Sequence, residues 1–482
     1  RFYCLTFNLS VKIYRSIVRN MKRIISYVFA GLIMTGCNDF LDLKPIDFPT
    51  EETFYNDVKG LEGAVIGVYD ELQSSSQYGG NFMTLMEIRG DNVMDDNSGA
   101  GGGVRYQIEV FTETPANTNL SDAWSSLYKT IYRCNLVLHN VESVKMTEDK
   151  YNEIVGQVSF VRALSYFNLV RLWGKVPLVT EPQTVEDARN NKREEVSVIY
   201  NQIIEDLNVA KSLPSEWPDE EKGRVTSYAA CALLAKVYLY MENYDKVYEE
   251  LTPIVSVIKE GKELSLVPTP ETFPNNLKTS KDIIFAVQYL KGGIGESVHQ
   301  NNRYRNNDNG NVISLPQSEF ESDNDNRKFL LAPTGSGERP GKFDTPATNN
   351  ETSSDFPVLR CADVMLMYAE ALNELSQSPT QGALDALNAV RNNAGLPDKE
   401  LSDFVSKESL RKAIHKERRL ELALECDRWF DIVRTNIFNE VFVGVDSYRV
   451  LYPIPQTEIE NVNDKSDWQN EGYILSLIHI SE

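Results

Sequence analysis

The stretch Ala229–Val255, AACALLAKVYLYMENYDKVYEELTPIV, carries the strongest fold signal in the chain. Large apolar and small residues recur along it at helical spacings: Leu234, Ala235, Tyr238, Tyr244, Val247, Leu251 and Ile254. Residues three and four apart lie on the same face of an α-helix, so each half of the stretch has one apolar face. The pattern predicts two helices joined by a turn.

The offsets in this stretch resemble those of the tetratricopeptide unit, a helix–turn–helix repeat of about 34 residues in which small residues let the paired helices approach closely. A weaker copy runs from Met365 to Gly395 and ends at Gly395-Leu396-Pro397, a typical helix terminator. Several such pairs are expected to stack into a right-handed helical scaffold.

Three earlier segments have the same periodicity: Leu61–Leu72, Trp124–Leu138 and Ile154–Trp173, the last stopping at Gly174 with Pro177 beyond it. Two stretches, Tyr78–Glu113 and Lys291–Asn350, are rich in Gly, Asn and Asp and are predicted to be loops, with a brief strand at Ile283–Tyr289 just before the second. The predicted fold is mainly α, an α-α superhelix with tetratricopeptide-like helix pairs, long loops and a few short strands.

The amino-acid composition limits the classes of molecule that the protein is expected to bind. The 482 residues include 70 acidic and 49 basic ones, a formal charge of -21, and so negative a surface repels phosphate backbones, which argues against nucleic acid. The chain has 23 Tyr and 5 Trp, an excess that suits stacking on sugar rings. Its six cysteines form no CxxC pair, so no disulfide framework or zinc module is expected, and a free cysteine in a helix usually behaves as a small buried hydrophobe.

The N-terminal region has the pattern of a targeting signal. Met21-Lys22-Arg23 precedes an apolar run, Ile24–Met34, which is too short to span a bilayer. Thr35-Gly36-Cys37 follows and resembles the lipobox of bacterial lipoproteins, in which the chain is cut before the cysteine and the thiol is diacylated. The alternative is an ordinary secretory signal. We expect residues 1–20 to be an upstream non-native extension, 21–36 a lipoprotein signal peptide, 37–473 a single helical domain and 474–482 an artefactual tail.

The sequence contains none of the common catalytic or metal-binding motifs considered below. None of the four histidines, His139, His299, His415 and His479, lies in an HExxH context, and there is no GxSxG elbow. A P-loop fails in Gly335–Lys342, and Met94 breaks a calcium-loop pattern before Gly99. No metal, cofactor or catalytic residue is predicted. The 70 acids leave the paired carboxylates of a glycoside hydrolase open, because only their separation in space decides that question.

Five segments in a fixed order are more specific. They read CNDFLDLKPIDFPT followed by ETFYND, SLYKTIYRCNLVL, VLRCADVMLMYAEALNEL, ERRLELALECDRWFDIVR and LYPIPQTEI. From Cys37 to Tyr473 the chain resembles the SusD/RagB family of Bacteroidetes outer-membrane lipoproteins, departing from it at Cys426-Asp427, where the family more often has Gly and a polar residue. Helical spacing would place Glu421, Glu425 and Arg428 on one face as a structural ion-pair set, and the same interpretation is given to Asp363 and Glu370.

The resemblance implies a surface-exposed lipoprotein of the outer membrane that binds an oligosaccharide or polysaccharide and, acting as a lid, presents it to a SusC-type TonB-dependent barrel without catalysis. We place the sugar site on the two loops. The predicted stacking platforms are Tyr78, Tyr106, Tyr289 and Tyr304, and the predicted hydrogen-bond donors are Asn97, Arg105, Arg303 and Arg305. For each tyrosine the alternative is burial in a helix groove. For the protein, the alternatives are a lipid-anchored glycoside hydrolase and a helical scaffold that binds a partner protein.

Overall fold

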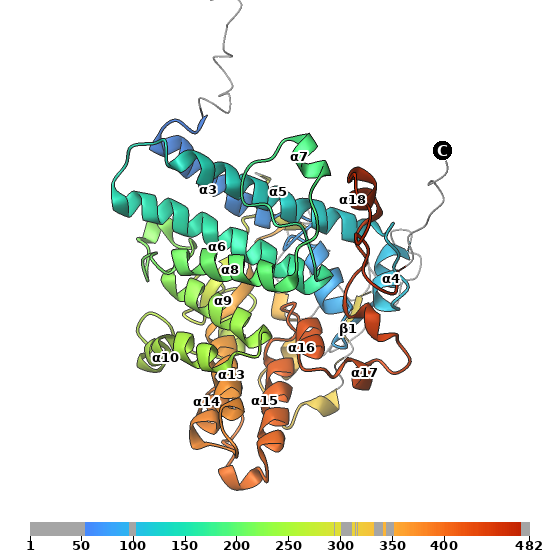
Figure 1. Cartoon of the computed structure of the whole chain (residues 1–482). Coiled ribbons are helices and arrows are strands. Elements are labelled where there is room, and N and C mark those ends of the chain that lie inside the picture. Colours follow the sequence, from blue (N-terminus) through green and yellow to red (C-terminus); the bar gives the residue numbers. More distant parts are fainter. Residues whose placement is uncertain are drawn as a thin grey trace, which may run out of the picture. The chain divides into compact units, whose positions relative to one another are not determined.

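A computed structural model describes residues 54–95, 103–293, 295–299, 311–313, 315, 317–331, 341–343 and 351–473. Residues Arg1–Asn56 and Asp57–Glu482 form two separate units, and the fold below is that of the second. Helices dominate it, as predicted (Figure 1). No helix in the described ranges has the length and apolar character needed to cross a bilayer.

The first half of this unit is built on long antiparallel-packed helices. In chain order it contains α3 (Val58–Leu72), the π-helix η2 (Met83–Ile88), α4 (Val104–Glu109), α5 (Thr118–Val141), α6 (Glu148–Trp173), α7 (Val185–Arg189) and α8 (Val196–Ala210). α6 is the central element, because α5 and α8 pack along it and α3 also contacts it. Trp124 of α5 and Trp173 of α6 meet edge to face with ring centroids 5.2 Å apart, an arrangement favoured by aromatic quadrupoles.

The two predicted helix pairs are confirmed. The first consists of α9 (Ser227–Tyr240) and α10 (Tyr244–Glu260), and the second of α13 (Cys361–Glu374) and α14 (Gln381–Asn393). α10 packs on both α9 and α13, so the pairs stack directly on each other although about a hundred residues separate them. Each pair's second helix begins at a side-chain cap, Asn243 for α10 and Thr380 for α14, which satisfies a backbone N–H that the helix itself leaves unbonded.

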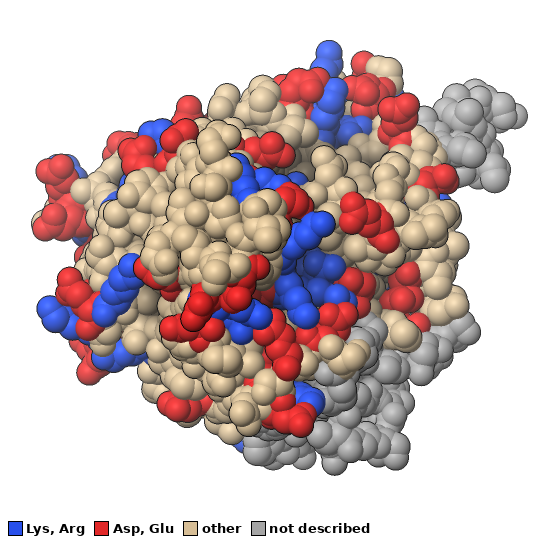
Figure 2. Space-filling model, turned by 90° about the horizontal axis from the view of Figure 1, so that it is seen from below, with Lys and Arg blue, Asp and Glu red and all other residues tan. Residues whose placement is uncertain are grey.

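The rest of the unit consists of the helix α15 and of shorter elements. The helices are α11 (Thr269–Thr272), α12 (Lys328–Leu331), α15 (Lys407–Glu421), α16 (Arg428–Arg434), α17 (Phe438–Val441) and α18 (Gln456–Asn461). The 3-10 turns are η4 (Asp219–Glu221), η6 (Gln317–Glu319), η7 (Gly341–Phe343), η8 (Leu401–Asp403) and η9 (Ser447–Val450). Over the face seen in Figure 2, acidic and basic side chains are interleaved.

Strands occur as three antiparallel pairs in the described residues. They are β1 (Val93–Asp95) with β4 (Asn311–Ile313), β2 (Ile283–Val287) with β6 (Phe356–Arg360), and β3 (Val298–His299) with β5 (Glu351–Thr352). β2 confirms the strand predicted at Ile283–Tyr289. In each pair the two strands are far apart in the sequence, so the pairs close the long connections back onto the helical scaffold.

The prediction that Tyr78–Glu113 is a loop is wrong in part. This segment contains the buried π-helix η2, the strand β1 and the helix α4. Its Gly and Asp residues suggested a loop, but η2 is apolar and packs against α4, α5 and α16, so tertiary burial outweighs local composition. The stretch 291–350 agrees better, since its described residues form only β3, β4 and short helical turns.

Candidate functional site

The two predicted glycan loops are attached to the fold at neighbouring points. β1 and β4 run antiparallel, with Asp95 opposite Asn311. Residues 96–102 follow Asp95, and residues 300–310 precede Asn311. Because facing residues of an antiparallel pair lie about 5 Å apart, segments some two hundred positions apart in the sequence join the fold at the same end of this strand pair. Asn97, Arg303, Tyr304 and Arg305 belong to these segments and, like Cys37, lie outside the described residues.

The strand pair β3–β5 joins the residues just before position 300 to those just after position 350. His299 of β3 faces Glu351 of β5. The Glu351 side chain accepts hydrogen bonds from the backbone N–H groups of Gly292, at 3.1 Å, and Gly293, at 2.9 Å. These bonds lower the pKa of Glu351, since they favour the charged carboxylate. The residues before β3 and those after position 350 are therefore held together at the base of the loop.

Helix α4 carries the two predicted site residues that the structure describes in this region. Arg105 pairs with Asp95, with Nε 3.4 Å from Oδ2, and retains 22% of its side-chain exposure. Burial lowers the pKa of Arg105, and Asp95 opposes that effect. Tyr106 is half-buried, and no described residue hydrogen-bonds its hydroxyl. A partly exposed ring next to a partly exposed guanidinium is the combination that recognises sugars, through the ring face and through donated hydrogen bonds.

One carboxyl group in this region is titratable near neutral pH. Glu109 of α4 accepts a hydrogen bond from the backbone N–H of Asp95 at 3.2 Å. Burial raises the pKa of Glu109 to about 7, and the negative charge of Asp95 adds to the rise. A protonated carboxylic acid can donate a hydrogen bond to a ligand oxygen, and it is also the state that general-acid chemistry uses.

Two of the predicted stacking tyrosines are buried. Tyr78 is 4% exposed, with its ring centroid 4.8 Å from that of Phe82 and 5.5 Å from that of Phe356. Its hydroxyl accepts a hydrogen bond from Asn168, and burial raises its pKa to about 12. Tyr289 is 1% exposed. Burial contradicts a stacking role for both residues, since neither ring has a face open to a sugar.

The block Glu417–Arg434 lies under this region as an ion-pair network, but not on the single helix face that was predicted. α15 ends at Glu421, Leu424 and Cys426 have positive φ of 70° and 65°, and α16 begins at Arg428. The predicted face through Glu421, Glu425 and Arg428 is therefore wrong. The broken turn is held from outside, because the Glu87 carboxylate of η2 accepts the backbone N–H groups of Leu424 at 2.9 Å and Cys426 at 3.0 Å.

The structural interpretation of these charges is confirmed by their partners. Arg360 pairs with Glu421 at 2.8 Å and with Glu425 at 2.7 Å, and Arg327 reaches Glu421 at 3.0 Å. Burial pushes the pKa of Glu421 upward, but Arg360 and Arg327 outweigh it and hold the pKa at about 2. The two other acids that were predicted to form ion pairs also do so. Asp363 pairs with Lys236 and with Arg418, and Glu370 pairs with Arg434.

The long loop is tied to this network through η7. Lys342 is 1% exposed, lies 2.6 Å from Glu425 and donates to the backbone oxygens of Glu421 and Ala423 at 2.9 Å. The ring of Phe343 stacks on that of Phe356, with centroids 6.0 Å apart and an interplanar angle of 11°. The lysine of the failed phosphate-loop motif is thus a buried structural cation that anchors the middle of the loop.

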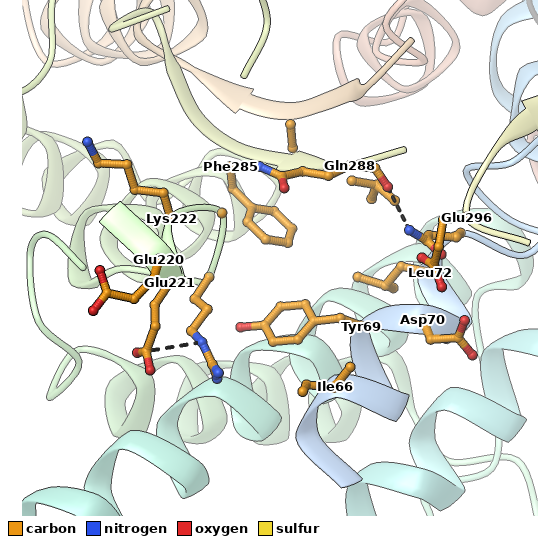
Figure 3. Close-up of a pocket in the computed structure, with 15 residues that line it drawn as sticks. Ile66, Tyr69, Asp70, Leu72, Glu220, Glu221, Lys222, Phe285, Gln288 and Glu296 are labelled. Atoms are coloured by element: carbon orange, nitrogen blue, oxygen red, sulfur yellow. Dashed lines mark hydrogen bonds and ion pairs between the residues drawn. The ribbon is translucent and has the colours of Figure 1, made fainter. Parts of the chain in front are cut away.

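A separate pocket of about 270 Å³ lies between α3, the turn after η4 and strand β2 (Figure 3). Tyr69 of α3 points into it from one side and Phe285 of β2 from the other. The Tyr69 hydroxyl is occupied, donating to Gln157 and accepting from the backbone N–H of Val225, both at 3.1 Å. The charged lining consists of Asp70, Glu220, Glu221, Glu296, Lys222 and Arg224.

This pocket has a mixed apolar and charged lining, and it offers no well-exposed aromatic ring with a free hydroxyl. Phe285 is only 3% exposed, and the Tyr69 hydroxyl has two partners. Within the described ranges no three His, Cys, Asp or Glu residues converge so as to hold a metal ion. We therefore take the loop region around α4, β1 and β4 as the candidate site.

A family model described as "Starch-binding associating with outer membrane" matches residues 39–239, and one described as "SusD family" matches residues 278–445. SusD-like protein P25 of Formosa agariphila is 26% identical over 94% of this chain and 99% of its own length. SusD-like protein P2 of the same organism is 28% identical over 93% and 99%.

Solved structures agree in fold. A laminarin-binding SusD-like protein is 26% identical with a TM-score of 0.73, and the match covers 87% of this chain and 100% of that one. Surface glycan-binding protein A from Bacteroides thetaiotaomicron has the same TM-score at 19% identity, which speaks to the fold alone. The two family models cover successive parts of the chain, the relatives match nearly end to end, and the five sequence segments fall in the family's order. On these grounds the chain belongs to the SusD/RagB family.

Proposed function

We propose that the protein binds an oligosaccharide at the cell surface and passes it to a SusC-type TonB-dependent barrel without cleaving it. The observation that carries this proposal is the likeness to the laminarin-binding SusD-like protein, which extends over 87% of this chain and all of that one. Likeness of fold alone would not suffice, because one fold serves many functions. The local support is a half-buried tyrosine and a partly exposed arginine on α4, next to the attachment points of two long loops.

We place the sugar site around Arg105 and Tyr106, with Asn97, Arg303, Tyr304 and Arg305 contributed by the two loops. Asp95 limits the freedom of the Arg105 guanidinium, so this donor is held in position before a sugar arrives. Tyr78 and Tyr289 are not part of the proposed site.

We also propose that the mature protein starts at Cys37, after a signal peptide at residues 21–36, and that lipid on its thiol holds the domain at the outer membrane. Support comes from the lipobox-like residues and from the family model whose description includes association with the outer membrane. Acyl chains contribute about 0.8 kcal/mol per buried methylene, so two or three chains suffice as an anchor. Incorporation of a palmitate analogue, lost in Cys37→Ser, is the expected result; equal labelling of both proteins would refute it.

The binding proposal is tested by affinity electrophoresis of the mature domain in gels that contain laminarin, starch, xylan or mannan. We expect retardation by at least one polysaccharide and a fall in affinity of about tenfold or more in Tyr106→Ala, the equivalent of about 1.4 kcal/mol. Tyr248→Ala is the matched control, because Tyr248 is 39% exposed on α10, in the first helix pair. No retardation by any polysaccharide would overturn the proposed function, and unchanged retardation of Tyr106→Ala would overturn the site.

Glycoside hydrolysis is the second candidate, because Glu109 has a pKa of about 7 and lies beside Asp95. The same polysaccharides are incubated with the protein and assayed for new reducing ends. We expect none above the level of Glu109→Gln, whose amide cannot transfer a proton. Release of reducing ends by the unmodified protein, abolished in Glu109→Gln, would establish hydrolysis in place of simple binding.

A further inference from the structure

A groove of about 470 Å³ opens along the N-terminal and middle turns of the long helix α5, between α5, α7 and α18. This volume lies within the range of about 300–1,000 Å³ that small-molecule sites occupy. Hydrogen bonds hold the walls of the groove together, because the segment after α18 is bonded to the end of α7. The backbone N–H of Asn463 donates to the Arg189 carbonyl at 2.9 Å, and the Asn463 side-chain amide donates to Asn190 at 3.0 Å.

One side of the groove is an aromatic row on α5. Trp124, Tyr128 and Tyr132 follow each other at intervals of four residues, which places them on one helix face. Trp124 is 2% exposed and forms the floor, and Tyr128 is fixed by a 2.7 Å hydrogen bond from its hydroxyl to the Pro177 carbonyl. Tyr132 is 46% exposed, and its hydroxyl has no hydrogen-bond partner among the described residues. The row therefore goes from a buried floor to an open ring.

The opposite rim combines apolar side chains such as Val185 and Val462 with side-chain amides, and it is nearly neutral. Gln183 and Asn191 hydrogen-bond each other in both directions, at 3.0 and 2.9 Å, which leaves each amide one further donor and one further acceptor. Asn461 adds a third amide, and the only charged lining residues are Arg189 and Glu458. One cation and one acid balance, in a chain whose formal charge is -21. Such a lining suits an uncharged ligand that has both apolar faces and hydroxyl groups.

We propose that this groove is a second carbohydrate subsite, which binds a neutral segment of the same polysaccharide. The proposal rests on the proposed function, but it uses α5, α7 and α18 in place of α4, β1 and β4. A pyranose ring presents an apolar face to an aromatic ring such as Tyr132 and equatorial hydroxyls to amides such as Gln183 and Asn191. Two subsites on one rigid scaffold strengthen binding to a long chain through effective concentration, while a short oligosaccharide reaches only one of them.

The test compares a polymer with a short ligand. Ala188→Trp fills the groove from the exposed face of α7, and Tyr132→Ala removes the open ring; Val209→Trp, at a 44% exposed position on α8 outside the lining, is the matched control for added bulk. Affinities of each variant are measured by isothermal titration calorimetry for laminarin and laminarihexaose and for starch and maltohexaose, with circular dichroism to check the fold.

For a polymer that the unmodified protein binds, we expect both groove variants to lose affinity by about three- to tenfold, since an avidity term is removed. Affinity for the matching hexasaccharide is expected to stay within about twofold, and Val209→Trp to behave as the unmodified protein. Equal polymer affinities in all variants would overturn the second subsite and leave the proposed function intact. If the unmodified protein binds none of the four ligands and no polysaccharide in the gels, the proposed function itself fails and the subsite with it.

Discussion

Arg360 donates to Glu421 twice, from Nη1 to the carboxylate at 2.8 Å and from Nη2 to the backbone oxygen at 2.6 Å. Arg360 is the last residue of β6, and Glu421 is the last residue of α15. The pair therefore joins the strand that returns from the long loop to the helix that leads into the broken turn. Both side chains are almost fully buried, at 2% and 1% exposure.

Replacing Glu421 should be strongly destabilising. Glu421→Gln leaves Arg360 and Arg327 each short of one buried counter-charge, and breaking a buried pair from one side costs about 3–5 kcal/mol. The measurement is the free energy of unfolding in urea at pH 7. Glu181→Gln, at a 73% exposed acid, is the control and should leave the midpoint unchanged. A loss in Glu421→Gln no larger than in the control would contradict the assignment of this network as structural.

Stability should also depend on the ionisation of Glu87. Burial raises the pKa of Glu87 in the folded protein from 4.5 to about 7, so the folded state holds a proton that the unfolded chain has released. The contribution of this group to stability is therefore full below about pH 4.5 and is lost as the pH rises through 7, a change on the order of 3 kcal/mol.

Glu87→Gln removes this titration and also weakens the acceptor for Leu424 and Cys426. We expect the variant to be less stable than the unmodified protein at pH 5, with the difference shrinking as the pH rises to 8. Urea unfolding at four pH values between these limits measures it. Parallel pH profiles for the two proteins would show that Glu87 does not titrate in this range.

Two glycine-to-alanine changes should act in opposite directions. Gly174, which ends α6, has φ of +71° and ψ of -118°, and an added Cβ would lie 2.9 Å from Leu451 Cδ1. Gly174→Ala should cost about 1–3 kcal/mol in unfolding free energy. Gly67 lies inside α3 with its nearest outside atom 4.0 Å away, so Gly67→Ala should add about 0.5–1 kcal/mol. Thermal melts of both variants test the pair, and equal shifts of the same sign would rule out the conformational explanation.

Position 426 should tolerate glycine better than a branched side chain. Cys426 has φ of +65°, a conformation that costs a non-glycine residue about 1–2 kcal/mol and that glycine adopts freely. Cys426→Gly relieves this strain but gives up a buried thiol that contacts the Phe82 carbonyl at 3.6 Å, so its net effect should be small. Cys426→Val should be the less stable of the two by about 2 kcal/mol. Urea midpoints in the reverse order would contradict a left-handed requirement here.

The departure from the family pattern at Cys426 is explained by the same geometry. The glycine that the sequence resemblance implies at this position would fit a backbone with positive φ, and this chain keeps the conformation with a cysteine. The turn is held in place by Glu87, which lies 337 residues before Leu424 in the sequence. No local pattern in Glu417–Arg434 predicts a break imposed from that distance, because helical periodicity continues through the segment.

For the predicted tyrosines too, the sequence alone could not decide which are buried and which are exposed. Tyr78, Tyr106 and Tyr289 all lie at loop-like positions in the sequence, and tyrosine suits both a core and a sugar platform. The structure buries Tyr78 and Tyr289 against partners such as Phe356 and Asp355 that follow much later in the chain, and leaves Tyr106 partly exposed. The α5–α7–α18 groove had no sequence signal, because its lining comes from segments separated by more than three hundred positions.

By itself the sequence determined the elements whose signals are local: the two helix pairs, the end of α6 at Gly174, the strand β2 and the order of the family segments. Helical periodicity and termination depend on residues within one or two turns, so they can be read along the chain. Only the tertiary structure decided which acids meet which arginines, where α15 breaks and which tyrosines face solvent. Burial and ion pairing depend on residues brought together from distant segments, and these contacts exist only once the helices have packed.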